Sequence, residues 1–313
     1  MPAVGSERST LANELNSAAN SSGGWSYYRG KASRLEPTSW AILALAGNRV
    51  AGAPGTDSNH RDFLTRCQRP DGWLVEDARW PVNIGFNALV AFAWLNQPDL
   101  AGEDKVRRLL AALAGSKGVQ APPSPAFTQD NSLQGWSWTD ATFSWVEPTA
   151  WGALALKKAM RAGVIADATS HARIDEANRM LFDRCGRTGG WNFGNPNVLG
   201  QDLFSHVPTT ALALLALQDR RDQPAVIRSL AFLESHWAEE PSLIALGLSL
   251  ICLSVHGRPT NAIEDRLRTD VALQLEGETI GHAHAGVPLS SLLGRAVALT
   301  ALSLQDNENA FRI

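Results

Sequence analysis

The sequence predicts an all-α fold, an (α/α)6 toroid of six helix-pair repeats that spans residues 1–313 as a single domain. Three observations predict it: a motif that occurs twice, degenerate copies of that motif along the rest of the chain, and an alternation of amphipathic with almost uniformly apolar helices. Six such pairs close into a ring of inner helices inside a ring of outer helices, which removes the exposed ends of an open solenoid. An open helical solenoid is the structural alternative.

The repeated motif joins a Gly-Trp turn to the start of an apolar helix. Residues 24–40 contain Gly-Trp-Ser-Tyr and then Glu-Pro-Thr-Ser-Trp, and residues 135–151 contain Gly-Trp-Ser-Trp and then Glu-Pro-Thr-Ala-Trp. The two copies lie 111 residues apart, and in both the Glu follows the first Trp by eleven positions. Proline is tolerated in a first helical turn because the N–H that it lacks has no partner there. Each Glu-Pro pair therefore predicts the start of an inner helix.

Degenerate copies predict the other four repeats. The apolar helices that they predict lie at 84–95, from Pro208 onward, at 243–253 and from Val287 to Leu302. Amphipathic segments at 174–184 and 226–236 predict outer helices, since their charged residues gather on one side. The Pro-rich insertion at 116–134 predicts a loop.

The bulk composition excludes several classes of function. A net charge of -3 and a pI near 6.2, with no basic stripe, give no reason to expect a nucleic-acid partner. An odd number of cysteines, three, fits a reducing compartment, and no apolar run reaches the length of a membrane span. We therefore expect a cytoplasmic protein without a membrane span, and peripheral contact with a membrane stays open.

The pattern resembles the prenyltransferase and squalene-cyclase repeat family, whose repeats carry a Gln-x-x-Asp-Gly-Gly/x-Trp turn between paired helices. The segment Gln68-Arg69-Pro70-Asp71-Gly72-Trp73 comes closest to that turn and is one residue shorter. The resemblance covers the whole chain. It implies a terpenoid-cyclase-like toroid whose aromatic central cavity binds an apolar small molecule, an isoprenoid or a lipid. It does not decide between a cyclase, a prenyltransferase and a protein without activity, because the repeat occurs in all three.

The chemical motifs of that family are absent. Triterpene cyclases protonate an alkene with Asp-x-Asp-Asp-Thr-Ala at the start of an inner helix, where this chain has Glu-Pro-Thr-Ser, Glu-Pro-Thr-Ala and Val-Pro-Thr-Thr. Prenyltransferases hold zinc with Asp-x-Cys, and no Asp stands two residues before Cys67, Cys185 or Cys252. We expect no metal and no cofactor. His206, His282 and His284 remain the alternative metal ligands.

Four polar residues are candidates for catalysis. Glu36 and Glu147 stand at the starts of inner helices, Asp140 lies in the loop before the second of them, and His206 lies just before Val207-Pro208. The helix dipole favours an ionised carboxylate at this place and lowers its pKa unless burial overrides it. We therefore expect Glu36 and Glu147 to act as bases or anchors; the structural alternative is a capping role.

The eleven Trp residues fall into two groups. Those of the repeat turns are expected to wedge between repeats: Trp25, Trp73, Trp136 and Trp191. Those left to line a ligand site are Trp40, Trp151, Trp138, Trp145 and Trp80. A lining role for Trp40 and Trp151 predicts that substitution by Leu weakens ligand binding but preserves stability.

Two other classes of function stay open. The missing motifs also fit a non-enzymatic binding or scaffold protein. Alternatively, Glu36 and Glu147 form the carboxylate pair of a carbohydrate-active (α/α)6 enzyme, which requires the two carboxyl groups to lie about 5–10 Å apart.

Overall fold

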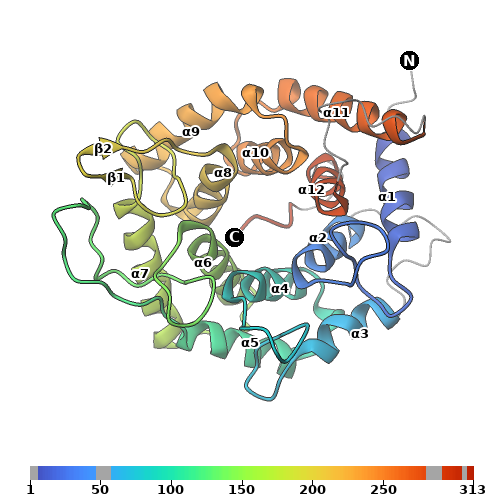
Figure 1. Cartoon of the computed structure of the whole chain (residues 1–313), viewed down its shortest axis with the longest axis horizontal. Helices are drawn as coiled ribbons and strands as arrows, with labels where there is room; N and C mark the ends of the chain where they lie inside the picture. The colour runs from blue at the N-terminus through green and yellow to red at the C-terminus, as the bar shows by residue number, and fades with distance from the viewer. Residues whose placement is uncertain (1–5, 47–57, 280–290, 305–308) are drawn as a thin grey trace. The chain divides into compact units, whose positions relative to one another are not determined.

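The computed structural model describes residues 6–46, 58–279, 291–304 and 309–313 (Figure 1). The chain divides into two compact units, of which unit 1 comprises residues 1–66 and 238–310 and unit 2 comprises residues 67–237 and 311–313. No helix in the described residues is long and apolar enough to cross a membrane.

Unit 1 contains three inner helices that pack side by side. They are α2 (Leu35–Ala46), α12 (Leu292–Leu302) and α10 (Leu243–Val255), and α12 lies between the other two. Its outer helices are α1 (Ser6–Ala18), α3 (Ser58–Cys67) and α11 (Asn261–Thr279). Helix α1 packs against both α2 and α12, so the first repeat and the last repeat are direct neighbours.

Unit 2 repeats this arrangement. Its inner layer is α4 (Ile84–Asn96), α6 (Val146–Arg161) and α8 (Val207–Ala216), with α6 between the other two. Its outer layer is α5 (Glu103–Gly115), α7 (Ala168–Asp183) and α9 (Pro224–His236). The short elements are the 3-10 turns η1 (Pro98–Leu100), η2 (Gln218–Arg220) and η3 (Trp237–Glu239), the last at the boundary of the units, and the strands β1 (Asn197–Val198) and β2 (Gln201–Asp202).

Each inner helix begins with a buried aliphatic residue. These first residues are Leu35, Ile84, Val146, Val207, Leu243 and Leu292. The helices start earlier than the Pro positions predicted, so Glu36 and Glu147 lie within the first turn and not outside it. The reason is that the first four N–H groups of a helix have no partner, so proline fits at the third position as well as at the first.

Three of the four predicted wedge residues are confirmed. Trp25, Trp136 and Trp191 are buried, and each indole Nε1 donates to a carbonyl of the preceding outer helix, at 2.7, 2.9 and 2.6 Å. Trp73 is half-exposed, and the fully buried Leu74 takes its place. The wedge prediction for Trp73 is therefore wrong.

In four repeats a side chain of the inner helix holds the turn that precedes it. Thr149 Oγ1 accepts from the backbone N–H of Trp136 at 2.9 Å and donates to its carbonyl at 3.3 Å. Thr38 makes the same pair of bonds with Trp25, and Thr210 makes it with Trp191. Asn87 does so for Leu74, through its amide.

Replacement of Thr149 by Val tests this clamp. The side chain keeps its shape but leaves the buried N–H of Trp136 without an acceptor, which costs about 1–3 kcal/mol. We expect T149V to lower the free energy of unfolding in urea by about that amount. The exposed T169V is the matched control, expected to stay within about 0.5 kcal/mol of the parent. Equal effects of the two changes would contradict the clamp.

Truncation after Gln274 tests the neighbourhood of the first and last repeats. It removes α12, which packs between α2 and α10 and against α1. Because three helices then lose their apolar partner, we expect a shortened chain without a cooperative thermal transition. A truncated protein that still unfolds cooperatively would contradict a closed ring of repeats.

Candidate functional site

The starts of the inner helices in unit 2 carry a group of aromatic rings, called here the outer aromatic group. Its six members come from three consecutive repeats: Phe86, Trp138, Phe143, Trp145, Phe193 and His206. They form three contacting pairs. The ring centroids of Phe86 and Trp138 lie 5.6 Å apart, those of Phe143 and Trp145 lie 6.4 Å apart, and those of Phe193 and His206 lie 4.7 Å apart.

Backbone bonds between repeats position these rings. The N–H of Ile84, the first residue of α4, donates to the carbonyl of Trp138 at 2.8 Å, and the N–H of Val146 donates to that of Phe193 at 2.9 Å. Trp145 and His206 are the N-cap residues of α6 and α8. Their rings therefore stand at equivalent places in successive repeats.

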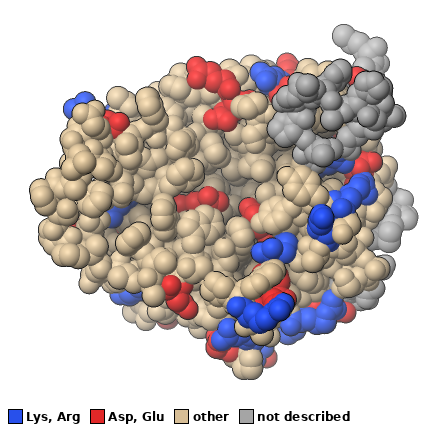
Figure 2. All heavy atoms as spheres, viewed as in Figure 1, with Lys and Arg blue, Asp and Glu red and all other residues tan. Residues whose placement is uncertain are grey.

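Several of these rings are open to solvent. Phe143 is 60% exposed and Phe193 is 55% exposed, while Trp138 and Trp145 are half-buried. The loop that follows Phe193 adds three exposed apolar residues, Leu199, Leu203 and Phe204. Charged side chains are sparse on this face, over β1, β2 and the neighbouring loops (Figure 2). Exposed apolar area of this kind marks binding surfaces more often than ordinary surface.

A second set of rings, called here the inner aromatic group, lies deeper on the same helices. It consists of Phe92 of α4, Trp151 of α6 and Phe311. The centroids of Phe92 and Trp151 lie 5.9 Å apart. Six residues separate Phe86 from Phe92 and also Trp145 from Trp151, so the inner group lies about 9 Å further along each helix axis.

The predicted ligand-lining residues are placed differently from one another. Trp138 and Trp145 belong to the outer aromatic group. Trp151 belongs to the inner group and is only 3% exposed, because Phe92 and Phe311 cover it. Trp40 is equally buried, in unit 1, and Trp80 lies exposed in the loop before α4. Burial of this degree leads us to expect a stability loss from Trp40→Leu and Trp151→Leu, against the expectation from the sequence.

The predicted polar residues are also dispersed. Glu147 is half-buried in the first turn of α6, between Trp145 and Trp151 in the sequence. Asp140 is exposed in the turn after Trp138. His206 packs its ring on Phe193. Within the described residues no three His, Cys, Asp or Glu side chains gather as a metal site, and His282 and His284 lie outside those residues.

Glu36 in unit 1 has an unusual environment. Its Oε2 accepts a hydrogen bond from the Tyr27 hydroxyl at 2.5 Å. Burial raises the pKa of this carboxyl above its ordinary value of 4.5, and the opposing effects of Tyr27 and of the Arg34 charge do not offset it. Glu36 is therefore the case in which burial overrides the helix dipole, the exception that the sequence analysis allowed.

Sequence reasoning missed the five phenylalanines of the two aromatic groups, which are Phe86, Phe92, Phe143, Phe193 and Phe311. Phe311 carries no repeat signal, so nothing in the pattern connected it with Trp151. The rings of Phe143 and Phe193 were not singled out either, although both stand in the turns of recognised repeats. Their common signal is an aromatic residue in the loop between the wedge Trp and the inner helix.

Comparison with known proteins shows the fold alone. The chain matches the type II terpene cyclase MstE from Scytonema with a TM-score of 0.58 and 15% identity, covering 95% of this chain and 97% of that one. It matches a GH76 alpha-mannanase from Bacteroides thetaiotaomicron with a TM-score of 0.60 and 14% identity, covering 98% of both. It matches an alpha-amylase from Clostridium perfringens with a TM-score of 0.61 and 9% identity, covering 95% of this chain and 96% of that one.

No family model and no curated protein matches the sequence. The structural matches and the helix pairs define the fold class: the chain is an all-α (α/α)6 toroid, as the sequence predicts. Terpene cyclases and glycoside hydrolases share this class, so the fold does not choose between them.

Glu36 makes stability depend on pH in a direction that can be measured. A raised folded pKa means that the folded state holds the proton more tightly than the unfolded state. The contribution to stability is complete below pH 4.5, the ordinary value, and is lost as the pH rises through the folded pKa. We expect urea unfolding of E36Q to lose this part of the pH dependence. Y27F removes a bond that lowers the pKa and should extend the loss to higher pH. Parallel pH profiles for parent and E36Q would contradict the assignment.

Proposed function

We propose that the chain binds an apolar ligand, an isoprenoid or a lipid, on the outer aromatic group of unit 2. One observation carries the proposal: rings from three successive repeats form three contacting pairs at the starts of α4, α6 and α8, and Phe143 and Phe193 are exposed. Aromatic faces favour hydrocarbon over ionic ligands. The inner aromatic group extends the same apolar lining along α4 and α6.

Glu147 marks the polar end of this proposed site. It lies in the first turn of α6, two residues after Trp145 and four residues before Trp151. A carboxylate there would accept a hydrogen bond from the hydroxyl group of a prenyl alcohol, while the hydrocarbon lies on the rings. Asp140 is the nearest further candidate in sequence, and His206 presents its ring as part of the aromatic surface. The odd number of cysteines, three, favours a reducing compartment, so we propose a cytoplasmic location.

Glu36 is a separate candidate, because it belongs to unit 1 and the proposed ligand site belongs to unit 2. Burial raises the pKa of its carboxyl and so favours the protonated form, which a group that donates a proton to an alkene requires. Activity towards a polyprenyl alkene is the reaction that tests this candidate, and binding without catalysis remains part of the proposal.

Carbohydrate binding is the second candidate. Exposed Trp and Phe rings also stack on the apolar faces of sugar rings, and amide groups accompany the rings of unit 2. Gln129 donates to Asn195 at 2.7 Å, and Asn192 bonds to the backbone of the same loop. Titration with oligosaccharides distinguishes this candidate from isoprenoid binding.

Substitution at the outer aromatic group tests the main proposal. We expect W145L and F143A each to weaken binding of farnesol by about three- to tenfold, the effect of losing one aromatic contact. E147Q should weaken binding of farnesol more than binding of the hydrocarbon farnesene, because only the alcohol offers a hydrogen bond. Isothermal titration and thermal melting, run on the same samples, separate binding from stability.

The matched control is I227A, which removes a half-exposed apolar side chain from α9. It should leave farnesol binding unchanged. Equal losses in I227A and W145L would indicate unspecific binding. Binding of mannotriose or xylotriose, with no binding of farnesol, would favour the carbohydrate candidate.

A further inference from the structure

The inner aromatic group contains a residue from the other end of the sequence. Phe311 is fully buried, with its centroid 5.0 Å from that of Phe92 and 6.4 Å from that of Trp151. The segment 311–313 that carries it forms no helix or strand and belongs to unit 2, whereas the residues before it belong to unit 1. The ring thus occupies the place that the sequence analysis assigned to a ligand of Trp151.

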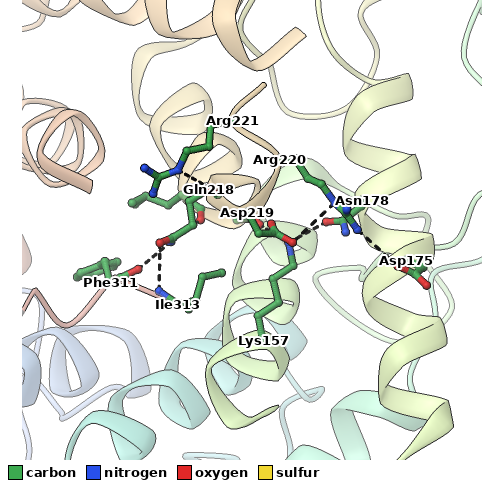
Figure 3. A network of polar contacts seen from close by, with 11 residues as sticks. Lys157, Asp175, Asn178, Gln218, Asp219, Arg220, Arg221, Phe311 and Ile313 are labelled. Atoms are coloured by element: carbon green, nitrogen blue, oxygen red, sulfur yellow. Dashed lines mark hydrogen bonds and ion pairs between the residues drawn. The ribbon is translucent and has the colours of Figure 1, made fainter. Parts of the chain in front are cut away.

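One side chain recognises the backbone of this segment. Gln218 Nε2 donates to the carbonyl of Phe311 at 2.8 Å, and Gln218 Oε1 accepts from the N–H of Ile313 at 3.1 Å (Figure 3). A primary amide that pairs with the carbonyl of one residue and the N–H of the second residue after it imitates the edge of a neighbouring strand. Lys158 Nζ adds a bond to the carbonyl of Arg312 at 3.2 Å.

The turn η2, which carries Gln218, is held by bonds that do not involve the segment 311–313. Lys157 of α6 donates to the carbonyl of Ala216, the last residue of α8, and to Asp219 Oδ1, both at 2.6 Å. It also donates to Asn178 Oδ1 of α7 at 3.0 Å, which uses its third proton (Figure 3). These bonds hold the turn η2, which carries Gln218, against α6. Gln218 Nε2 also donates to the carbonyl of Leu215 at 2.8 Å, a bond that does not involve the segment.

We propose that the segment 311–313 is a displaceable internal ligand, and that an apolar ligand reaches Trp151 and Phe92 by displacing the Phe311 ring. This inference rests on the proposed apolar binding function and adds its regulation. The contact includes one buried ring and three backbone bonds to two side chains. Gains of this kind are opposed by the conformational entropy that three ordered residues lose, which is of the same order.

A peptide supplied in trans tests the recognition itself. A variant lacking residues 311–313 should bind a dye-labelled peptide Asn-Ala-Phe-Arg-Ile, the sequence of residues 309–313. The peptide with Ala in place of Phe should bind at least roughly tenfold more weakly, because it lacks the ring. Fluorescence anisotropy measures both, and circular dichroism verifies that the variant is folded. A folded variant that binds both peptides equally, or neither, would overturn the proposal.

The full-length protein provides the second test, which does not require the truncated variant to fold. Because displacement reduces the apparent affinity by the fraction of molecules with the segment released, F311A should bind farnesol about tenfold more tightly than the parent. R312A is the matched control, since its side chain is exposed and its carbonyl is retained. Weaker or unchanged farnesol binding by F311A would show that Phe311 is a fixed part of the wall.

Hydrogen exchange separates the two proposals. Farnesol at saturation should remove the protection of the Ile313 N–H, while the amides of α6 and α8 stay protected. Persistent protection of Ile313 with farnesol bound would overturn displacement but leave the proposed function standing. Absence of farnesol binding in all variants, with peptide binding intact, would instead reject the isoprenoid and retain the internal ligand.

Discussion

The structure depends on holding each Gly-Trp turn against the first turn of an inner helix. The turn buries its backbone, and a buried N–H without a partner is costly, so every repeat of this kind needs an acceptor at one place. Thr38, Thr149 and Thr210 supply it. The Thr149 hydroxyl also lies close to Gly135, the residue before the wedge Trp136. A Cβ at position 135 would lie 2.2 Å from Thr149 Oγ1, which explains why this residue is glycine. One Thr thereby fixes the turn, the wedge Trp and the helix start.

The same turns join neighbouring repeats. The carbonyl of the second residue after the wedge accepts a hydrogen bond from the N–H of the first residue of the inner helix one repeat earlier. Trp138 accepts from Ile84 in this way, and Phe193 accepts from Val146. Tyr27, in the first repeat, does so for Leu292, in the last repeat, at 2.8 Å. The last inner helix therefore makes with the first turn the same backbone bond that α4 and α6 make with the turn of the next repeat. A closed ring of repeats requires such a bond between its last and first repeats, whereas in an open solenoid these two repeats are not neighbours.

The repeats could be predicted from the sequence because they are periodic. Contacts between residues that are distant in the sequence and lie outside the repeat could not. The spacing of thirteen residues that joins Trp25 to Thr38 also joins Leu74 to Asn87. This spacing identifies Leu74 as the wedge, whereas the Gly-Trp pattern pointed to Trp73.

The longer spacing of nineteen residues from Trp191 to Thr210 accommodates the insertion that contains β1 and β2. Between those strands Leu199 and Gly200 both have positive φ, at 51° and 79°, the geometry of a tight hairpin. No spacing within the repeat predicts the position of the Phe311 ring. Its partners Phe92, Trp151 and Gln218 are distant in sequence and unrelated by the repeat.

Comparison of the six helix starts also bears on the two glutamates. The second residue of each inner helix is, in order along the chain, Glu36, Gly85, Glu147, Pro208, Ile244 and Leu293. Glycine, proline and aliphatic residues start these helices as well as glutamate does, so the fold does not require an acid there. At Gly85 the ring of Trp138 occupies the space that a side chain would need, since a Cβ would lie 2.7 Å from it. Helix initiation alone therefore does not explain the acid at two of the six equivalent starts, and the two acids differ in environment: Glu36 accepts from the Tyr27 hydroxyl and burial raises its pKa, whereas Glu147 stands beside the aromatic N-cap Trp145.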